Sequence, residues 1–262
     1  MRFRRILYLE PGGSGQSRSR PCVLRIAEAH GASLTIRRVR PGAVERATSP
    51  YDLVVSVACP DSLQWPLRYA PAERDLISGW RCPVWILHPA QSGPIRMVLA
   101  GVDVSRGASE SLAARVVETA AAFARAAGAE VRLVHAFTVT GESLIRSRYR
   151  GGSPHALVRV LRAEASERRA RLQALVRRTA VRPKPEIALV HGRTIATLGW
   201  LAADYQADLL VVGASRHQHG LRRLIFPPTA EQLLGRIHAS IAVVQPDPVG
   251  TQRPEVSLAQ RA

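Results

Sequence analysis

The chain has 262 residues, of which 46% are hydrophobic and 22% are charged, and this composition excludes a wholly disordered chain. Its length suits either one large domain or two compact ones. The 37 Lys and Arg residues outnumber the 20 Asp and Glu residues, and the net charge of +17 raises nucleic acid, an anionic lipid surface and acidic ligands as candidate partners. Because the basic residues are spread along the chain, the charge is also typical of a solvated basic surface.

The cysteines and the apolar runs indicate the compartment. Cys22, Cys59 and Cys82 are odd in number and have no CxxC spacing, so a disulfide framework is not expected. No apolar run reaches the ~18–20 residues that cross a bilayer. The apolar stretch after the basic start is too short for a signal peptide. We therefore expect a cytoplasmic protein without a membrane span.

Four segments of the first part of the chain recur in the same order farther on. Residues 4–11, 30–39, 51–58 and 77–90 resemble residues 95–104, 127–136, 207–214 and 233–247, respectively. Such an ordered set of matches predicts a tandem duplication. The first half lacks most of the interval that separates Gly128 from Asp208 in the second half, so it is a trimmed copy.

The second half alternates strands and helices. We expect strands at 95–102, 131–137, 187–190, 208–213 and 240–244, and helices at about 108–127, 157–178, 194–206 and 228–237. The strands are continuous apolar runs, which is typical of strands buried on both faces of a parallel sheet. The predicted fold class is therefore α/β, with tandem doubly wound parallel sheets. We expect Thr194 to cap its helix and the final strand to lie at the sheet edge.

Proline and glycine near residues 88–94 mark the boundary between the halves. We expect a truncated domain at 1–90, a complete domain at 93–247 and a flexible tail at 248–262. The first half is expected to pack against the second as an intramolecular pseudo-dimer. Its GGSG run at 12–15 lacks the further residues of a dinucleotide-binding or Walker motif, so a flexible turn is expected there.

Four segments of the second half carry a family resemblance: 101–112 (GVDVSRGASESL), 128–137 (GAEVRLVHAF), 207–234 and 239–247. They resemble the universal stress protein family in its tandem two-domain form. Residues 83–104 and 217–229 are similar to its E-type subgroup. The resemblance implies an adenine-nucleotide α-hydrolase-like fold, in which the second domain has a five-stranded parallel sheet of order 3-2-1-4-5 and the first domain is truncated.

Some members of this family bind ATP at the carboxyl ends of the first and fourth strands, where the reversal of strand order opens a crevice. The resemblance places Asp103 after the first strand, Phe137 at the end of the second and Gly213 after the fourth. Asp103 takes the position of the aspartate that lies against the adenosine part of the nucleotide. In the first half, Glu10 and Pro11 stand at that position.

The phosphate-binding motif of the ATP-binding members is altered in this chain. Arg216 replaces its second glycine, and Pro227-Pro228 replaces a Gly-Ser pair, with Thr229 just beyond. Because proline has no N–H to donate, two donors for a triphosphate are missing. ATP is therefore disfavoured, and no other cofactor is expected.

Basic residues lie in the segment after the fourth strand. This cluster is either a solvated basic loop or a site for a carboxylate or phosphate head group. It comprises Arg216, His217, His219, Arg222 and Arg223. The two histidines alone do not make a zinc site, because zinc takes at least three protein ligands. No motif pairs a nucleophile with a base, so no catalytic residue is nominated.

These features predict a non-catalytic stress-response protein that binds a small ligand or a protein partner. The E-type resemblance implies a lipid-like acyl ligand. The alternatives are an ATP-binding stress regulator and a basic protein that binds nucleic acid. Asp103 could instead cap its own turn, and the i,i+4 pairs Glu164–Arg168 and Glu167–Arg171 are typical of a solvent-exposed helix face.

Overall fold

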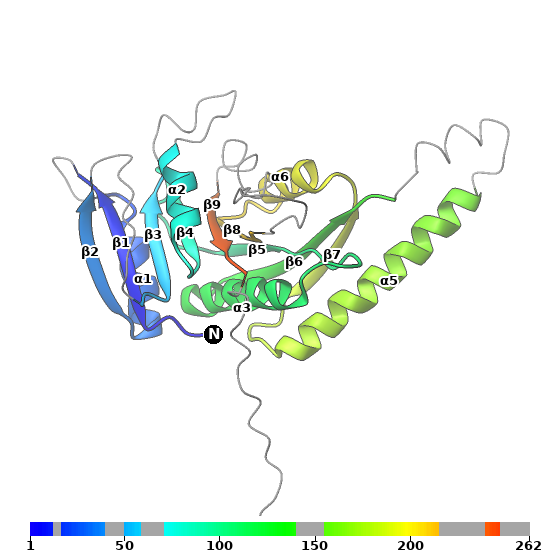
Figure 1. The fold of residues 1–262 in the computed structure, drawn as a ribbon, viewed down its shortest axis with the longest axis horizontal. Coiled ribbons are helices and arrows are strands. Elements are labelled where there is room, and N and C mark those ends of the chain that lie inside the picture. The colour runs from blue at the N-terminus through cyan, green and yellow to red at the C-terminus, as the bar shows by residue number, and fades with distance from the viewer. Residues whose placement is uncertain (13–16, 40–49, 59–70, 140–154, 215–238, 247–262) are drawn as a thin grey trace, which may run out of the picture.

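The computed structural model describes residues 1–12, 17–39, 50–58, 71–139, 155–214 and 239–246. Within these ranges, nine strands form one sheet of order β2-β1-β3-β4-β9-β8-β5-β6-β7 (Figure 1). The strands are β1 Arg5–Pro11, β2 Ser33–Val39, β3 Leu53–Val57, β4 Val84–Leu87, β5 Met97–Gly101, β6 Glu130–Phe137, β7 Glu186–His191, β8 Leu209–Gly213 and β9 Ser240–Val244. All neighbouring pairs are parallel except β4 and β9.

The second half places its strands in the order β7-β6-β5-β8-β9, with β5 between β6 and β8. Its described helices are α3 Glu110–Ala127, α5 His155–Thr179 and α6 Thr194–Asp204. The α/β class and the mostly parallel sheet predicted from the apolar strands are confirmed. The expected helix at 228–237 lies outside the described residues. The prediction that Thr194 caps α6 is wrong: Arg193 is the N-cap residue, and its side chain makes no capping bond.

The first half contributes four strands and the helices α1 Arg20–His30 and α2 Pro71–Gly79. One contact occurs in both halves. Asp52 Oδ2 accepts hydrogen bonds from the backbone N–H groups of Arg4 and Arg5, at 2.7 and 3.0 Å. Asp208 Oδ2 accepts the equivalent bonds at the start of β5, from Arg96 and Met97, at 2.7 and 3.1 Å. Each aspartate therefore ties the first strand of its half to the loop before the neighbouring strand.

The two halves join in the middle of the sheet. β4 and β9 pair antiparallel, with Trp85 opposite Ala242. The expectation that β9 lies at a sheet edge is therefore wrong for the whole sheet, whose described edges are β2 and β7. The physical reason is that β9 is fully buried, and pairing with β4 satisfies backbone groups that an edge would leave open.

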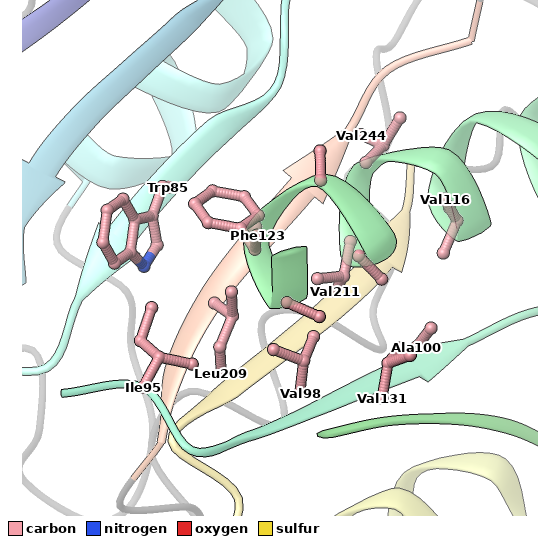
Figure 2. Packing of buried hydrophobic residues seen from close by; sticks show 14 of the residues in the cluster. Trp85, Ile95, Val98, Ala100, Val116, Phe123, Val131, Leu209, Val211 and Val244 are labelled. Carbon is pink, nitrogen blue, oxygen red and sulfur yellow. The ribbon is translucent and has the colours of Figure 1, made fainter. Parts of the chain in front are cut away.

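Helices cover both faces of this sheet. Apolar residues of α1, α3 and α5 form a core with one face, and those of α2 and α6 form a core with the other. Figure 2 shows the first core at the join, where Trp85 of β4 faces Phe123 of α3. The ring centroid of Phe123 lies 5.0 Å from that of Trp85 and 5.3 Å from that of Phe3. One side chain of the second half thus packs between two aromatic rings of the first.

None of the helices in the described ranges is both long and apolar enough to cross a membrane.

Candidate ligand-binding groove

A groove of about 630 Å³ lies between the segment that follows β5 and helix α5. This volume is within the range of roughly 300–1,000 Å³ that is usual for small-molecule sites. We call it the Asp103 groove. Its lining residues are Asp103, Val104, Ser105, Arg106, Gly107, Ala108, Glu110, Ala113, Arg171, Ala174, Leu175 and Arg178.

Asp103 holds the turn at the mouth of the groove. Its Oδ1 accepts a hydrogen bond from the backbone N–H of Ser105 at 2.9 Å and a second one from the Ser105 hydroxyl. The capping role that the sequence allowed is therefore present, and the exposed Asp103 side chain lines the groove as well. Gly107 completes the turn with φ +82°, a left-handed conformation that favours glycine.

The start of α3 forms one wall. Ser109 is its N-cap residue, and its hydroxyl accepts a hydrogen bond from the N–H of Leu112 at 3.3 Å. Glu110 lies in the first turn, where the partial positive charge of the helix end favours a carboxylate. It binds Arg178 of α5, and this guanidinium lowers the pKa of Glu110 below its ordinary value.

Arginines connect α5 to the other wall. Arg171 donates to Glu167 at 2.6 Å and to the carbonyl of Val104 at 3.0 Å. Arg106 reaches the same carboxylate from the β5–α3 loop, at 3.1 Å, and lowers the pKa of Glu167. The groove therefore has a charged rim, in which three arginines are paired with glutamates. Ala113, Ala174 and Leu175 give it an apolar floor.

Phe137 is not among the lining residues of the groove. It is buried, and the guanidinium carbon of Arg168 lies 5.0 Å from the centroid of its ring.

Two residues earlier on β6, His135 is also buried, and its Nδ1 donates to the carbonyl of Val102 at 2.9 Å. Burial lowers the pKa of His135, so it is neutral near pH 7. This hydrogen bond fixes β6 to the residue that follows β5, so His135 has a structural role.

Gly213 has a packing function. A Cβ at this position would lie 2.9 Å from Cγ of Leu112, so the absence of a side chain lets α3 approach β8 closely. Gly213 is not among the residues that line the groove.

We expect Gly213→Ala to lower the free energy of unfolding by about 1–3 kcal/mol, because the added methyl group overpacks the contact with Leu112. Urea denaturation checks this value. In a Leu112→Ala background the same change is expected to cost less than about 1 kcal/mol. Gly93→Ala is the matched control, since a Cβ there meets nothing within 4 Å. Equal stability of Gly213→Ala and Gly93→Ala contradicts the packing explanation.

The remaining residues expected at the site, Arg216, His217, His219 and Thr229, lie outside the described residues, as does Pro227-Pro228. Sequence reasoning missed Arg171, Ala174 and Arg178. Their spacing of three and four residues puts them on one face of α5, and that periodicity was the signal that could have found them. Among the described residues, no group of three His, Cys, Asp or Glu side chains could hold a metal ion.

In the first half, the side chain of the next-to-last residue of β1 points into the protein. Glu10 is 2% exposed, and its carboxylate accepts a hydrogen bond from the N–H of Ser17 at 3.4 Å. Arg20 and Arg38 lie 3.8 and 4.0 Å from it. The two halves thus differ in the chemistry at the carboxyl ends of β1 and β5.

Comparison with known proteins identifies relatives. The universal stress protein family model matches residues 94–245. A candidate universal stress protein from Pseudomonas aeruginosa UCBPP-PA14 is 17% identical, with a TM-score of 0.66 and 94% of each chain covered. A functionally unknown protein from Pseudomonas aeruginosa PAO1 is 18% identical, with a TM-score of 0.60 and coverage of 94% of this chain and 93% of that one. At these identities the structural likeness shows the fold. No curated protein sequence matches the chain.

Proposed function

We propose that this chain, which belongs to the universal stress protein family, is a non-catalytic stress-response regulator that binds a small ligand in the Asp103 groove. The position of the groove carries the proposal. It follows the carboxyl end of β5, which lies between β6 and β8, and open parallel sheets bind their ligands outside the carboxyl ends of strands. The groove combines fixed charged groups with an apolar floor, which is typical of a binding site.

We also propose that the chain is a tandem duplication, with a truncated domain at 1–90 and a complete one at 93–247, closest to the E-type subgroup. The paired contacts of Asp52 and Asp208 support this, because each ties down the first strand of its half. In this account the first domain is the packing partner of the second, and β4 and β9 form the join of an intramolecular pseudo-dimer.

ATP is not the ligand that we propose. The sequence places Arg216 and Pro227-Pro228 where the ATP-binding members have backbone donors. Gly213 is the glycine of that motif that remains in this chain. Its close contact with Leu112 explains why a glycine is needed there without any role in binding phosphate.

Blocking the groove tests the proposal. Ala174 is an exposed residue of α5 that lines the groove, so Ala174→Trp is expected to fill it without disturbing the core. Native mass spectrometry of the purified protein should show a bound small molecule in the wild type and its loss in Ala174→Trp. Ala170→Trp, an exposed position of the same helix outside the groove, is the control and should keep it. Equal ligand content in the two variants contradicts the proposed site.

A second candidate function is binding to a polyanion such as nucleic acid. The observation that favours it is the exposed basic surface of α5, which includes Arg159, Arg162, Arg169 and Arg177, on a chain of net charge +17. Binding of this kind weakens steeply with salt. A titration of a short DNA duplex at two salt concentrations tests it, and undetectable binding at low salt removes this candidate.

A further inference from the structure

Three guanidinium groups, those of Arg106, Arg171 and Arg178, line one groove together with the carboxylates of Asp103 and Glu110. A guanidinium has five N–H donors. In the described part of the structure, Arg171 uses one donor for Glu167 and one for Val104, and Arg178 directs Nη1 and Nη2 to Glu110. Arg106 uses Nε and Nη2 for Glu167. Among the described residues, each of the three guanidinium groups therefore has N–H donors beyond those that these partners take.

The amino end of α3 contributes a positive partial charge to the same groove. α3 is 18 residues long, and both Ala108 just before it and Glu110 in its first turn line the groove. The exposed N–H groups and the aligned peptide dipoles of a helix amino end favour an anion. Glu110 supplies a carboxylate in this first turn, and that carboxylate binds Arg178. Its side chain is 79% exposed, so an incoming anion can replace it on Arg178 without unfolding the core.

The floor of the groove is apolar but short. Ala174 and the buried Leu175 come from one turn of α5, and Ala113 comes from α3. A ring or a short chain can lie on these side chains while its charged group reaches the arginines.

We propose that the Asp103 groove binds a small amphipathic anion, in which a phosphate or carboxylate group takes the place of Glu110 on Arg178 while an apolar body lies against Ala174 and Leu175. This inference rests on the proposed function and names the chemical class of its ligand. It gives Arg178 and Glu110 opposite effects on affinity: the arginine attracts the ligand, whereas the glutamate competes with it.

Isothermal titration calorimetry with three probes tests the inference. Phenyl phosphate and benzoate carry the two anionic groups on the same ring, and benzyl alcohol is the neutral analogue. We expect at least one anion to bind ten or more times more tightly than benzyl alcohol, and the tighter anion identifies the group. Arg178→Gln is expected to weaken anion binding about tenfold, and Glu110→Gln is expected to strengthen it several-fold.

Arg177→Gln is the matched control, because it removes the same charge from the neighbouring, exposed position of α5. If Arg177→Gln weakens anion binding as much as Arg178→Gln does, the affinity depends only on the net charge of the protein, and the inference is overturned. Failure of both anions to bind overturns it too. If the wild type carries a bound molecule that Ala174→Trp loses, the proposed function stands and only the ligand class is wrong. If Ala174→Trp loses no bound molecule, the proposed function and the ligand class are both wrong.

Discussion

Replacing Phe123 with alanine is expected to lower the free energy of unfolding by about 3–5 kcal/mol, the largest loss that we predict for a single change. The side chain is fully buried and packs against Trp85 and Phe3, which both belong to the first half. Its removal leaves a cavity at the join and takes away two aromatic contacts. Urea denaturation followed by circular dichroism measures the change.

Leu24→Ala is the control for this prediction. Leu24 is an apolar residue of α1 that is 37% exposed, so its truncation should change the stability by no more than about 0.5 kcal/mol. A second observable is the number of unfolding transitions. The wild type should unfold in one cooperative step because the halves share a sheet and a core. If Phe123→Ala lowers the free energy of unfolding as little as Leu24→Ala does, Phe123 does not hold the two halves together as we infer.

Removing the carboxylate of Asp208 is expected to destabilise the protein by about 2 kcal/mol. Asp208→Ala deletes an acceptor that binds two backbone N–H groups at the start of β5, and hydrogen bonds to charged groups are among the stronger ones. Asp52→Ala should cause a loss of similar size at the start of β1, because its contacts are the same. Thermal or urea unfolding of both variants checks the prediction.

Asp204→Ala is the matched control, since Asp204 is an exposed aspartate at the end of α6, four residues before Asp208. Similar stability of Asp204→Ala and Asp208→Ala would show that the two backbone bonds contribute little. A large loss in Asp208→Ala with none in Asp52→Ala would count against the structural equivalence of the two halves.

Much of the fold could be predicted from local patterns. The apolar runs that became β8 and β9 are short, continuous and flanked by turn residues, so both their strand character and the parallel sheet followed from the sequence. The strand that pairs with β9 at the join could not be predicted from the sequence. An apolar strand has the same pattern whether it is a covered edge or is paired on both sides, and the pairing with β4 depends on two surfaces that are far apart in the sequence.

The residues of the candidate site also include some that the sequence predicts and some that it does not. Asp103 could be located because its position follows directly from the strand before it. Arg171 and Arg178 could not be assigned, because their role depends on which face of α5 turns toward the β5–α3 loop. The sequence of this helix is rich in arginine, but an arginine-rich face has the same pattern whether it meets solvent or a groove. Gly213 was assigned to a ligand site because it belongs to a ligand-binding motif. The structure shows that its packing against Leu112 also requires a glycine.

The most direct test of the account is a map of ligand contacts by NMR. Backbone amide shifts of the full chain are recorded during titration with the tighter of the two anionic probes. The account predicts that the largest shifts fall at Ser105 to Glu110 and at Arg171 to Arg178, the two walls of the Asp103 groove. Largest shifts elsewhere, such as at Glu10 near the end of β1 and at Ser17, would contradict it.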